Sequence, residues 1–187
     1  VEPLVQCAGG MAMHDGSYLR RVREACDRHG VHLIADEIAV GFGRTGTLFA
    51  HEQAGIRPDF LCLSKGITGG FLPLSVVLTT DTVYEAFYDD SAAKAFLHSH
   101  SYTGNPLACA AALAVLDIFR DDDVIAANAL KAARFDGLLD PLRGDARLAH
   151  LRRTGMIWAF DVAAPVKGFA RRFTAAASAR GLLLVPL

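Results

Sequence analysis

Continuous apolar runs separated by helical patterns organise the first two thirds of the chain. Val31–Ala35, Phe60–Leu63 and Leu74–Thr79 have the length and composition of strands. Between the first short run, Pro3–Gln6, and Val31, apolar residues recur at helical spacing over Ser17–His29. Continuous rather than alternating apolar strands indicate a parallel sheet that helices cover on both faces. We therefore predict an α/β fold for this part of the chain.

The rest of the chain is richer in helical patterns. An alanine-rich stretch, Pro106–Phe119, predicts a helix with proline in its first turn, and residues 121–150 are helical in character. Gly155–Val162 then predicts a strand and Phe169–Arg180 a helix. We place a division after residue 125, so that residues 126–187 form a connecting helix and the beginning of a small α+β unit.

A lysine and a carboxylate stand at the ends of two predicted strands. Asp36 closes the apolar run Val31–Ala35, and Lys65 follows Phe60–Leu63 in a glycine-rich loop. Ligands of open α/β sheets bind beyond the carboxyl ends of the strands, so the two side chains can converge there. Such a pair suits pyridoxal phosphate, because an amine can form a Schiff base with its aldehyde and a carboxylate can hold the proton on its ring nitrogen.

Four stretches of the sequence resemble one enzyme family. Asp36–Gly46, Ser64–Gly70, His98–Leu107 and Glu2–Gly10 are similar to segments of the class III aminotransferases. The resemblance implies the large domain of the fold-type-I pyridoxal phosphate enzymes, here in part, followed by the start of the small domain. It also implies a homodimer with active sites at the interface, and it indicates that the chain is an internal piece of a longer polypeptide.

The resemblance assigns a role to five side chains. Lys65 would be the Schiff-base lysine and then the group that moves the proton, and Asp36 would pair with the pyridine nitrogen. Ile38 would pack on the cofactor ring, Ser101 would reach the phosphate bound by the opposite subunit, and Arg44 would face the substrate. Each has a plainer reading: a solvated loop lysine, a strand cap, core packing, a loop hydroxyl and a surface ion pair.

Neighbouring polar residues are better explained by structure than by chemistry. Glu37 would point to the face opposite Asp36 and serve as a hydrogen-bond partner. Asn105 precedes Pro106 and suits a helix cap. His98 and His100 have no further ligands nearby in the sequence, so we assign no metal to them.

Within the class, the motifs are most similar to members that pass an amino group from S-adenosylmethionine to 8-amino-7-oxononanoate, a step of biotin synthesis. Another class III enzyme acting on an ω-amino acid or a diamine stays open, as does a non-catalytic dimerisation module. Cys7 stands where glycine is common, and Val185 where these members tend to place an arginine that binds the substrate carboxylate. The turn that cradles the cofactor phosphate is not in these residues, so we expect the piece alone to be inactive.

Composition excludes several other classes of protein. Lys+Arg number 19 and Asp+Glu 20, so nothing favours nucleic acid or an anionic membrane surface. No uncharged apolar stretch is long enough to predict a transmembrane helix. The four cysteines form no Cys-x-x-Cys pair, which favours free thiols in a reducing cytoplasm.

Overall fold

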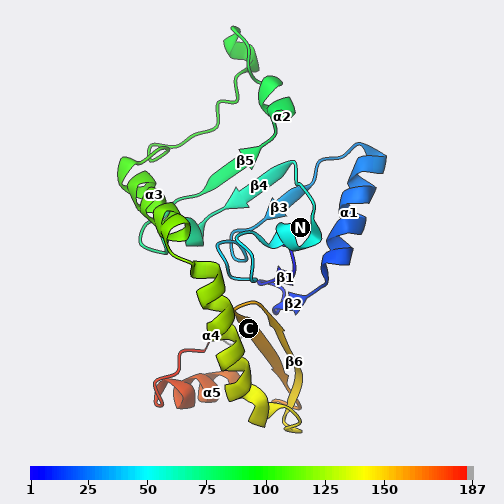
Figure 1. Ribbon diagram of the computed structural model, residues 1–187, viewed down its shortest axis with the longest axis vertical. Coiled ribbons are helices and arrows are strands. Elements are labelled where there is room, and N and C mark those ends of the chain that lie inside the picture. Colours follow the sequence, from blue (N-terminus) through cyan, green and yellow to red (C-terminus); the bar gives the residue numbers. More distant parts are fainter. Residues whose placement is uncertain (185–187) are drawn as a thin grey trace.

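A three-stranded sheet forms the centre of the computed structural model, which describes residues 1–184 (Figure 1). The strands β3 (Ile34–Asp36), β4 (Phe60–Leu63) and β5 (Val76–Thr79) lie in this order, with β3 parallel and β5 antiparallel to β4. The predicted parallel direction is therefore wrong for β5. The segment before β5 holds only one 3-10 turn, and a parallel return would need a longer crossover.

The predicted first helix exists and begins one residue earlier than Ser17. α1 spans Gly16–His29, and Asp15 caps it by accepting a 2.6 Å hydrogen bond from the Ser17 amide. Gly30, with φ of 61°, ends the helix in the left-handed conformation.

A small antiparallel hairpin precedes α1, and the C-terminal part contains a second one. β1 (Val5–Gln6) pairs with β2 (Ala12–Met13), and β6 (Leu148–Thr154) pairs with β7 (Ile157–Val162). The prediction of helical character up to residue 150 is wrong after residue 142. Residues 143–147 form turns, and residues 148–150 enter β6, where cross-strand hydrogen bonds and packing outweigh local propensity.

The remaining elements are helical. α3 (Pro106–Asp121) and α4 (Val124–Leu139) follow one another along one side of the molecule, and α4 runs down beside β6 (Figure 1). The other helices and 3-10 turns are α2 (Asp81–Glu85), α5 (Phe169–Ser178), η1 (Ala50–Ala54), η2 (Lys65–Thr68), η3 (Ala92–Lys94) and η4 (Asp140–Leu142). Within residues 1–184 no helix is long and apolar enough to cross a membrane.

Two clusters of buried apolar side chains hold these elements together. One joins the β1 strand to α1, η1 and, through Ile157, to β7; it contains Leu4, Val5, Leu19, Val40, Ala50, Ala54 and Ile157. The other lies between the β4–η2 segment and α3, and contains Phe42, Leu63, Ile67 and Ala112. The β6–β7 hairpin thus shares a core with the N-terminal residues. The four cysteines are free thiols, as predicted, and are partly exposed.

An ion pair fastens α1 to the segment that leads into β4. Asp59 accepts hydrogen bonds from Arg23 Nη1 at 2.8 Å and from the Leu33 amide at 2.6 Å, and its pKa is lowered chiefly by Arg23. We expect Asp59→Asn to lower the free energy of unfolding of the full-length protein by about 2 kcal/mol at neutral pH, because Arg23 loses a charged acceptor. Urea denaturation measures this.

The pH dependence and a control sharpen that test. A lowered pKa in the folded state means that the contribution of Asp59 is complete above the ordinary carboxyl value of 3.8 and is lost as the pH falls through the folded value. The loss caused by Asp59→Asn should therefore shrink as the pH falls below 3.8. Asp27 also pairs with Arg23 but is 65% exposed, so Asp27→Asn should cost less than about 0.5 kcal/mol. Equal losses for the two variants would contradict the prediction.

Candidate active site

Lys65 begins η2, directly beyond the carboxyl end of β4. Its φ is 47°, a left-handed conformation that residues other than glycine rarely adopt. The loop around it is fixed: Ser64 Oγ donates to the Leu74 carbonyl at 2.7 Å, and the buried Thr68 hydroxyl donates to the Leu72 carbonyl at 2.6 Å. Backbone strain of this kind persists where the surroundings enforce it, and it gathers at functional sites.

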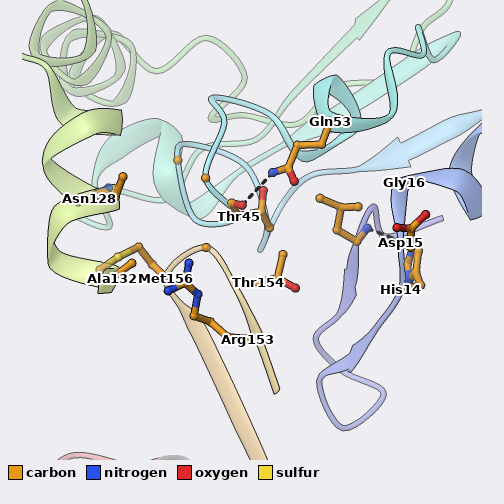
Figure 2. A pocket seen from close by; sticks show the side chains of 15 residues that line it. His14, Asp15, Gly16, Thr45, Gln53, Asn128, Ala132, Arg153, Thr154 and Met156 are labelled. Carbon is orange, nitrogen blue, oxygen red and sulfur yellow. Dashed lines mark hydrogen bonds between the residues drawn. The ribbon is translucent and has the colours of Figure 1, made fainter. Parts of the chain in front are cut away.

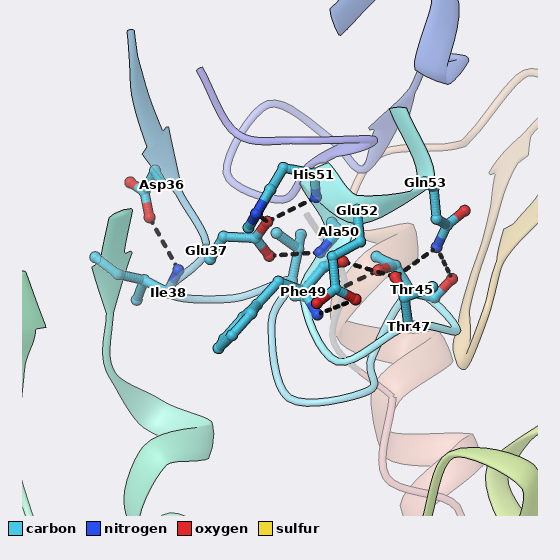
Figure 3. Close-up of polar contacts among 11 residues, drawn as sticks. Asp36, Glu37, Ile38, Thr45, Thr47, Phe49, Ala50, His51, Glu52 and Gln53 are labelled. Atoms are coloured by element: carbon cyan, nitrogen blue, oxygen red, sulfur yellow. Dashed lines mark hydrogen bonds and ion pairs between the residues drawn. The ribbon is translucent and has the colours of Figure 1, made fainter. Parts of the chain in front are cut away.

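Asp36 ends β3, the strand parallel to β4. It pairs in register with Cys62, three residues before Lys65, so both groups belong to the same edge of the sheet. Its Oδ1 accepts a 3.1 Å hydrogen bond from the Ile38 amide, which fixes the carboxylate (Figure 3).

The thiol of Cys7 lies within the electrostatic reach of both groups. Its pKa is raised, first by burial and then by the Glu2 carboxylate, whereas the positive charges of Lys65 and Arg44 lower it and the Asp36 charge raises it. The turn after β1 therefore brings a cysteine to the lysine and carboxylate predicted from the sequence. Sequence reasoning treated Cys7 only as a change in a turn and missed this position.

A cavity of about 630 Å³ opens beside Lys65. Of the predicted site residues, Lys65, Ile38 and Arg44 line it, whereas Asp36 and Ser101 do not. The other lining residues are Cys7, Met11, Ala39, Gly41, Phe42, Gly66, Gly69, Gly70, Val115, Ile118, Phe119 and Ile157. The cavity thus has one amine, one guanidinium and one thiol among mostly apolar walls, which is a composition typical of small-molecule sites.

The sequence did not predict the contact between Phe42 and Gly66 in the wall of this cavity. Phe42 has a φ of 55° and packs against Gly66, where an added Cβ would lie 2.8 Å from the ring and from the Phe42 Cβ. The Lys65 loop can therefore approach Phe42 only because glycine follows the lysine. The signal in the sequence was the glycine on each side of Phe42 together with Gly66.

Glu37 has the structural role predicted for it. It is fully buried and turns away from Asp36 toward η1, where its oxygens accept hydrogen bonds from the Ala50 and His51 amides, each at 2.8 Å (Figure 3). The His51 ring nitrogen Nδ1 lies 2.9 Å from the same carboxylate. Glu37 is thereby occupied with holding η1 against the strand end.

Ser101 lies on the exposed segment between α2 and α3, which reaches away from the sheet (Figure 1). Nearby residues make hydrogen bonds within the same segment: His100 Nδ1 accepts from the Tyr102 amide at 3.1 Å, and Asn105 caps α3 through the Leu107 amide, as predicted.

No group of residues suited to a metal occurs in the part of the chain that the structure describes. Contact of Ser101 with a second subunit stays a prediction, and Val185 lies outside the described residues.

Comparison with known proteins places the chain in a family. The family model described as aminotransferase class-III matches residues 1–187. The chain is 53% identical over 166 residues to the adenosylmethionine-8-amino-7-oxononanoate aminotransferase of Helicobacter pylori, covering 86% of this chain and 38% of that protein.

Solved structures agree with the sequence comparison. The enzyme of the same description from Methanocaldococcus jannaschii superimposes with a TM-score of 0.92 at 33% identity, over 100% of this chain and 46% of that one. An amine transaminase from an uncultivated Pseudomonas species, solved in its PLP-bound form, gives 0.89 at 36% identity over 98% and 44%. The chain thus spans less than half the length of the relatives that it matches.

Proposed function

Because the chain belongs to the class III aminotransferase family, we propose that the full protein is an adenosylmethionine–8-amino-7-oxononanoate aminotransferase. It would use pyridoxal phosphate to move an amino group from S-adenosylmethionine to 8-amino-7-oxononanoate, giving 7,8-diaminononanoate for biotin. The observation that carries the proposal is the position of Lys65, which has a strained backbone and lies on the wall of a cavity. The strand that precedes it is paired with the strand that ends at Asp36. The choice of substrates rests on the relative at 53% identity.

The residues present suit the ring and aldehyde end of the cofactor. When bound, pyridoxal phosphate supplies an aldehyde for the amino group and a ring that accepts electron density. The cavity beside Lys65 has room for a small ligand at about 630 Å³, and it offers one lysine amine. Ile38 and Phe42 give it apolar walls. Ser101 is proposed to serve the phosphate of a second subunit, in a homodimer.

Each polar residue then has a separate task. Lys65 would hold the cofactor covalently and, once its amine is free, take a proton from the substrate carbon and return it. Asp36, which ends the adjacent strand just outside the cavity lining and is fixed by the Ile38 amide, would accept a hydrogen bond from the protonated ring nitrogen. Arg44, exposed at the rim of the cavity, is the proposed partner of the substrate carboxylate. We further propose that residues 1–125 belong to the cofactor-binding domain and that 126–187 begin the small domain.

A donor assay on the full-length protein tests the proposal. Under single-turnover conditions, S-adenosylmethionine should convert the bound cofactor to pyridoxamine phosphate, while ornithine and a diamine should do so at least about tenfold more slowly. Borohydride reduction before the donor is added should leave a pyridoxyl group on Lys65, located by peptide mapping.

The outcomes separate the rival functions. Faster conversion by ornithine or the diamine would assign the protein to another class III activity. This rival has some support, since the amine transaminase of the Pseudomonas species matches at a TM-score of 0.89. Absence of the pyridoxyl label from the full-length protein would favour a non-catalytic dimerisation module.

A further inference from the structure

The β6–β7 hairpin packs against the segments that form the wall of the Lys65 cavity and contributes one residue to it. Ile157, the first residue of β7, is buried in the same core as Leu4 and Val40, and it also lines the cavity. The hairpin lies far along the chain from the strand ends that present Lys65 and Asp36 (Figure 1). Two polar contacts extend this packing.

Arg152 on β6 makes the first of them. Its Nε donates to the Met11 carbonyl at 3.0 Å and its Nη2 to the Gly10 carbonyl at 2.8 Å. Asp161, on the paired strand β7, lies 3.2 Å from Nη1 and holds the guanidinium in place. The side chain is 23% exposed. A planar guanidinium is suited to bridging adjacent acceptors in this way. The turn that it binds carries Cys7 and Met11 into the cavity.

The turn of the hairpin makes the second contact. The Met156 amide donates to the Arg44 carbonyl at 2.8 Å. Gly155, with φ of 56°, sits against the backbone of Thr45, and an added Cβ would lie 2.6 Å from the Arg44 carbonyl oxygen. Only glycine combines this conformation with so close an approach. Figure 2 shows Thr45 next to the turn that carries Thr154 and Met156, beside a second cavity of about 450 Å³.

We infer that Arg152 and Gly155 are positioning residues of the active site. Arg152 sets the place of the Cys7–Met11 wall, and the Gly155–Met156 turn sets the place of Arg44, although neither Arg152 nor Gly155 lines the cavity. The inference rests on the proposed function for its effect on turnover, whereas its effect on the wall can be measured without cofactor or substrate. Displacement of a site by about 1 Å can cost on the order of a hundredfold in rate.

The test compares Arg152→Met with the wild type in the full-length protein. In the cofactor-free form, alkylation of Cys7, followed by peptide mapping, should become about tenfold faster, because the turn that carries Cys7 loses two hydrogen bonds and opens more often. Cys26 on α1 reports on general loosening, and its rate should stay unchanged. In the holoenzyme, kcat for the proposed transamination should fall about tenfold or more. Arg152→Lys, which retains the charge, should give a Cys7 alkylation rate and a kcat between those of the wild type and those of Arg152→Met.

Arg153→Met is the matched control. Arg153 is the next residue of the same strand, but its ion pair is with Asp136 on α4. This variant should label Cys7 at the wild-type rate. Equal Cys7 labelling in Arg152→Met and the wild type would overturn the inference, and so would faster labelling of both Cys7 and Cys26, which indicates a general structural role. If Cys7 is alkylated at the expected rates in the wild type and the variants but the wild-type holoenzyme shows no transamination, the proposed function alone is refuted.

Discussion

Replacing Lys65 with alanine is expected to lower kcat/KM for transamination by about 10⁴-fold or more in the full-length protein. The substitution removes the one amine on the cavity wall, and with it both the covalent hold on the cofactor and the group that moves the proton. No neighbour on the cavity wall can replace it: Arg44 carries a guanidinium rather than an amine, and the raised pKa of Cys7 keeps that thiol neutral.

Chemical rescue distinguishes lost chemistry from lost structure. A small primary amine such as ethylamine should restore part of the rate in Lys65→Ala, in proportion to its unprotonated fraction, because the vacated space can admit it. Lys131→Ala is the control, since Lys131 is an exposed lysine on α4. It should keep full activity. Wild-type turnover in Lys65→Ala, or a loss of similar size in Lys131→Ala, would contradict the assignment.

An independent measurement reports whether Lys65 lies where the structure places it. Because its charge lowers the pKa of Cys7, that thiol should titrate at a higher pH in cofactor-free Lys65→Ala than in the wild type. Lys65→Arg retains the charge and should leave the titration unchanged. Alkylation rates of Cys7 across the alkaline range, resolved by peptide mapping, give this value without any catalytic turnover.

Local sequence patterns predicted much of the fold. The apolar runs predicted β4 with the bounds it has, and Pro106 predicted the first turn of α3, because burial and proline geometry act on short stretches. The direction of β5 could not be predicted in this way. An apolar run has the same appearance in either direction, and here the short segment after η2 decides the pairing.

The sequence likewise predicted some residues of the candidate site and not others. Lys65 and Asp36 were predicted as site residues from their places at strand ends, and in the structure Asp36 ends β3 while Lys65 lies just beyond the end of the adjacent parallel strand β4. The walls contributed by Met11 and Ile157 were not found, because they come from two hairpins far apart in the sequence. Arg152 had no local signal at all, since its contacts with the Gly10 and Met11 carbonyls exist only in the folded chain.

Asp36→Asn is expected to lower kcat by about 10²- to 10⁴-fold. The amide has the size of the carboxylate and can still accept from the Ile38 amide, so the strand end should keep its shape. What is lost is the negative charge that would hold a proton on the ring nitrogen. Because the Asp36 charge raises the pKa of Cys7, its loss should also make Cys7 titrate at a lower pH. This shift is opposite in direction to the one expected for Lys65→Ala.

Glu37→Gln, one residue further, provides the matched comparison. Glu37 is buried and accepts from the Ala50 and His51 amides, so an amide group there would face a donor and cost about 1–3 kcal/mol of unfolding free energy. We therefore expect opposite patterns: Asp36→Asn loses turnover and keeps stability, while Glu37→Gln loses stability and keeps most of its turnover while it is folded. Urea denaturation and donor half-reaction rates on both variants give the two quantities. If Asp36→Asn keeps its turnover while the Cys7 titration moves as expected, the carboxylate lies near the cavity but has no part in the chemistry.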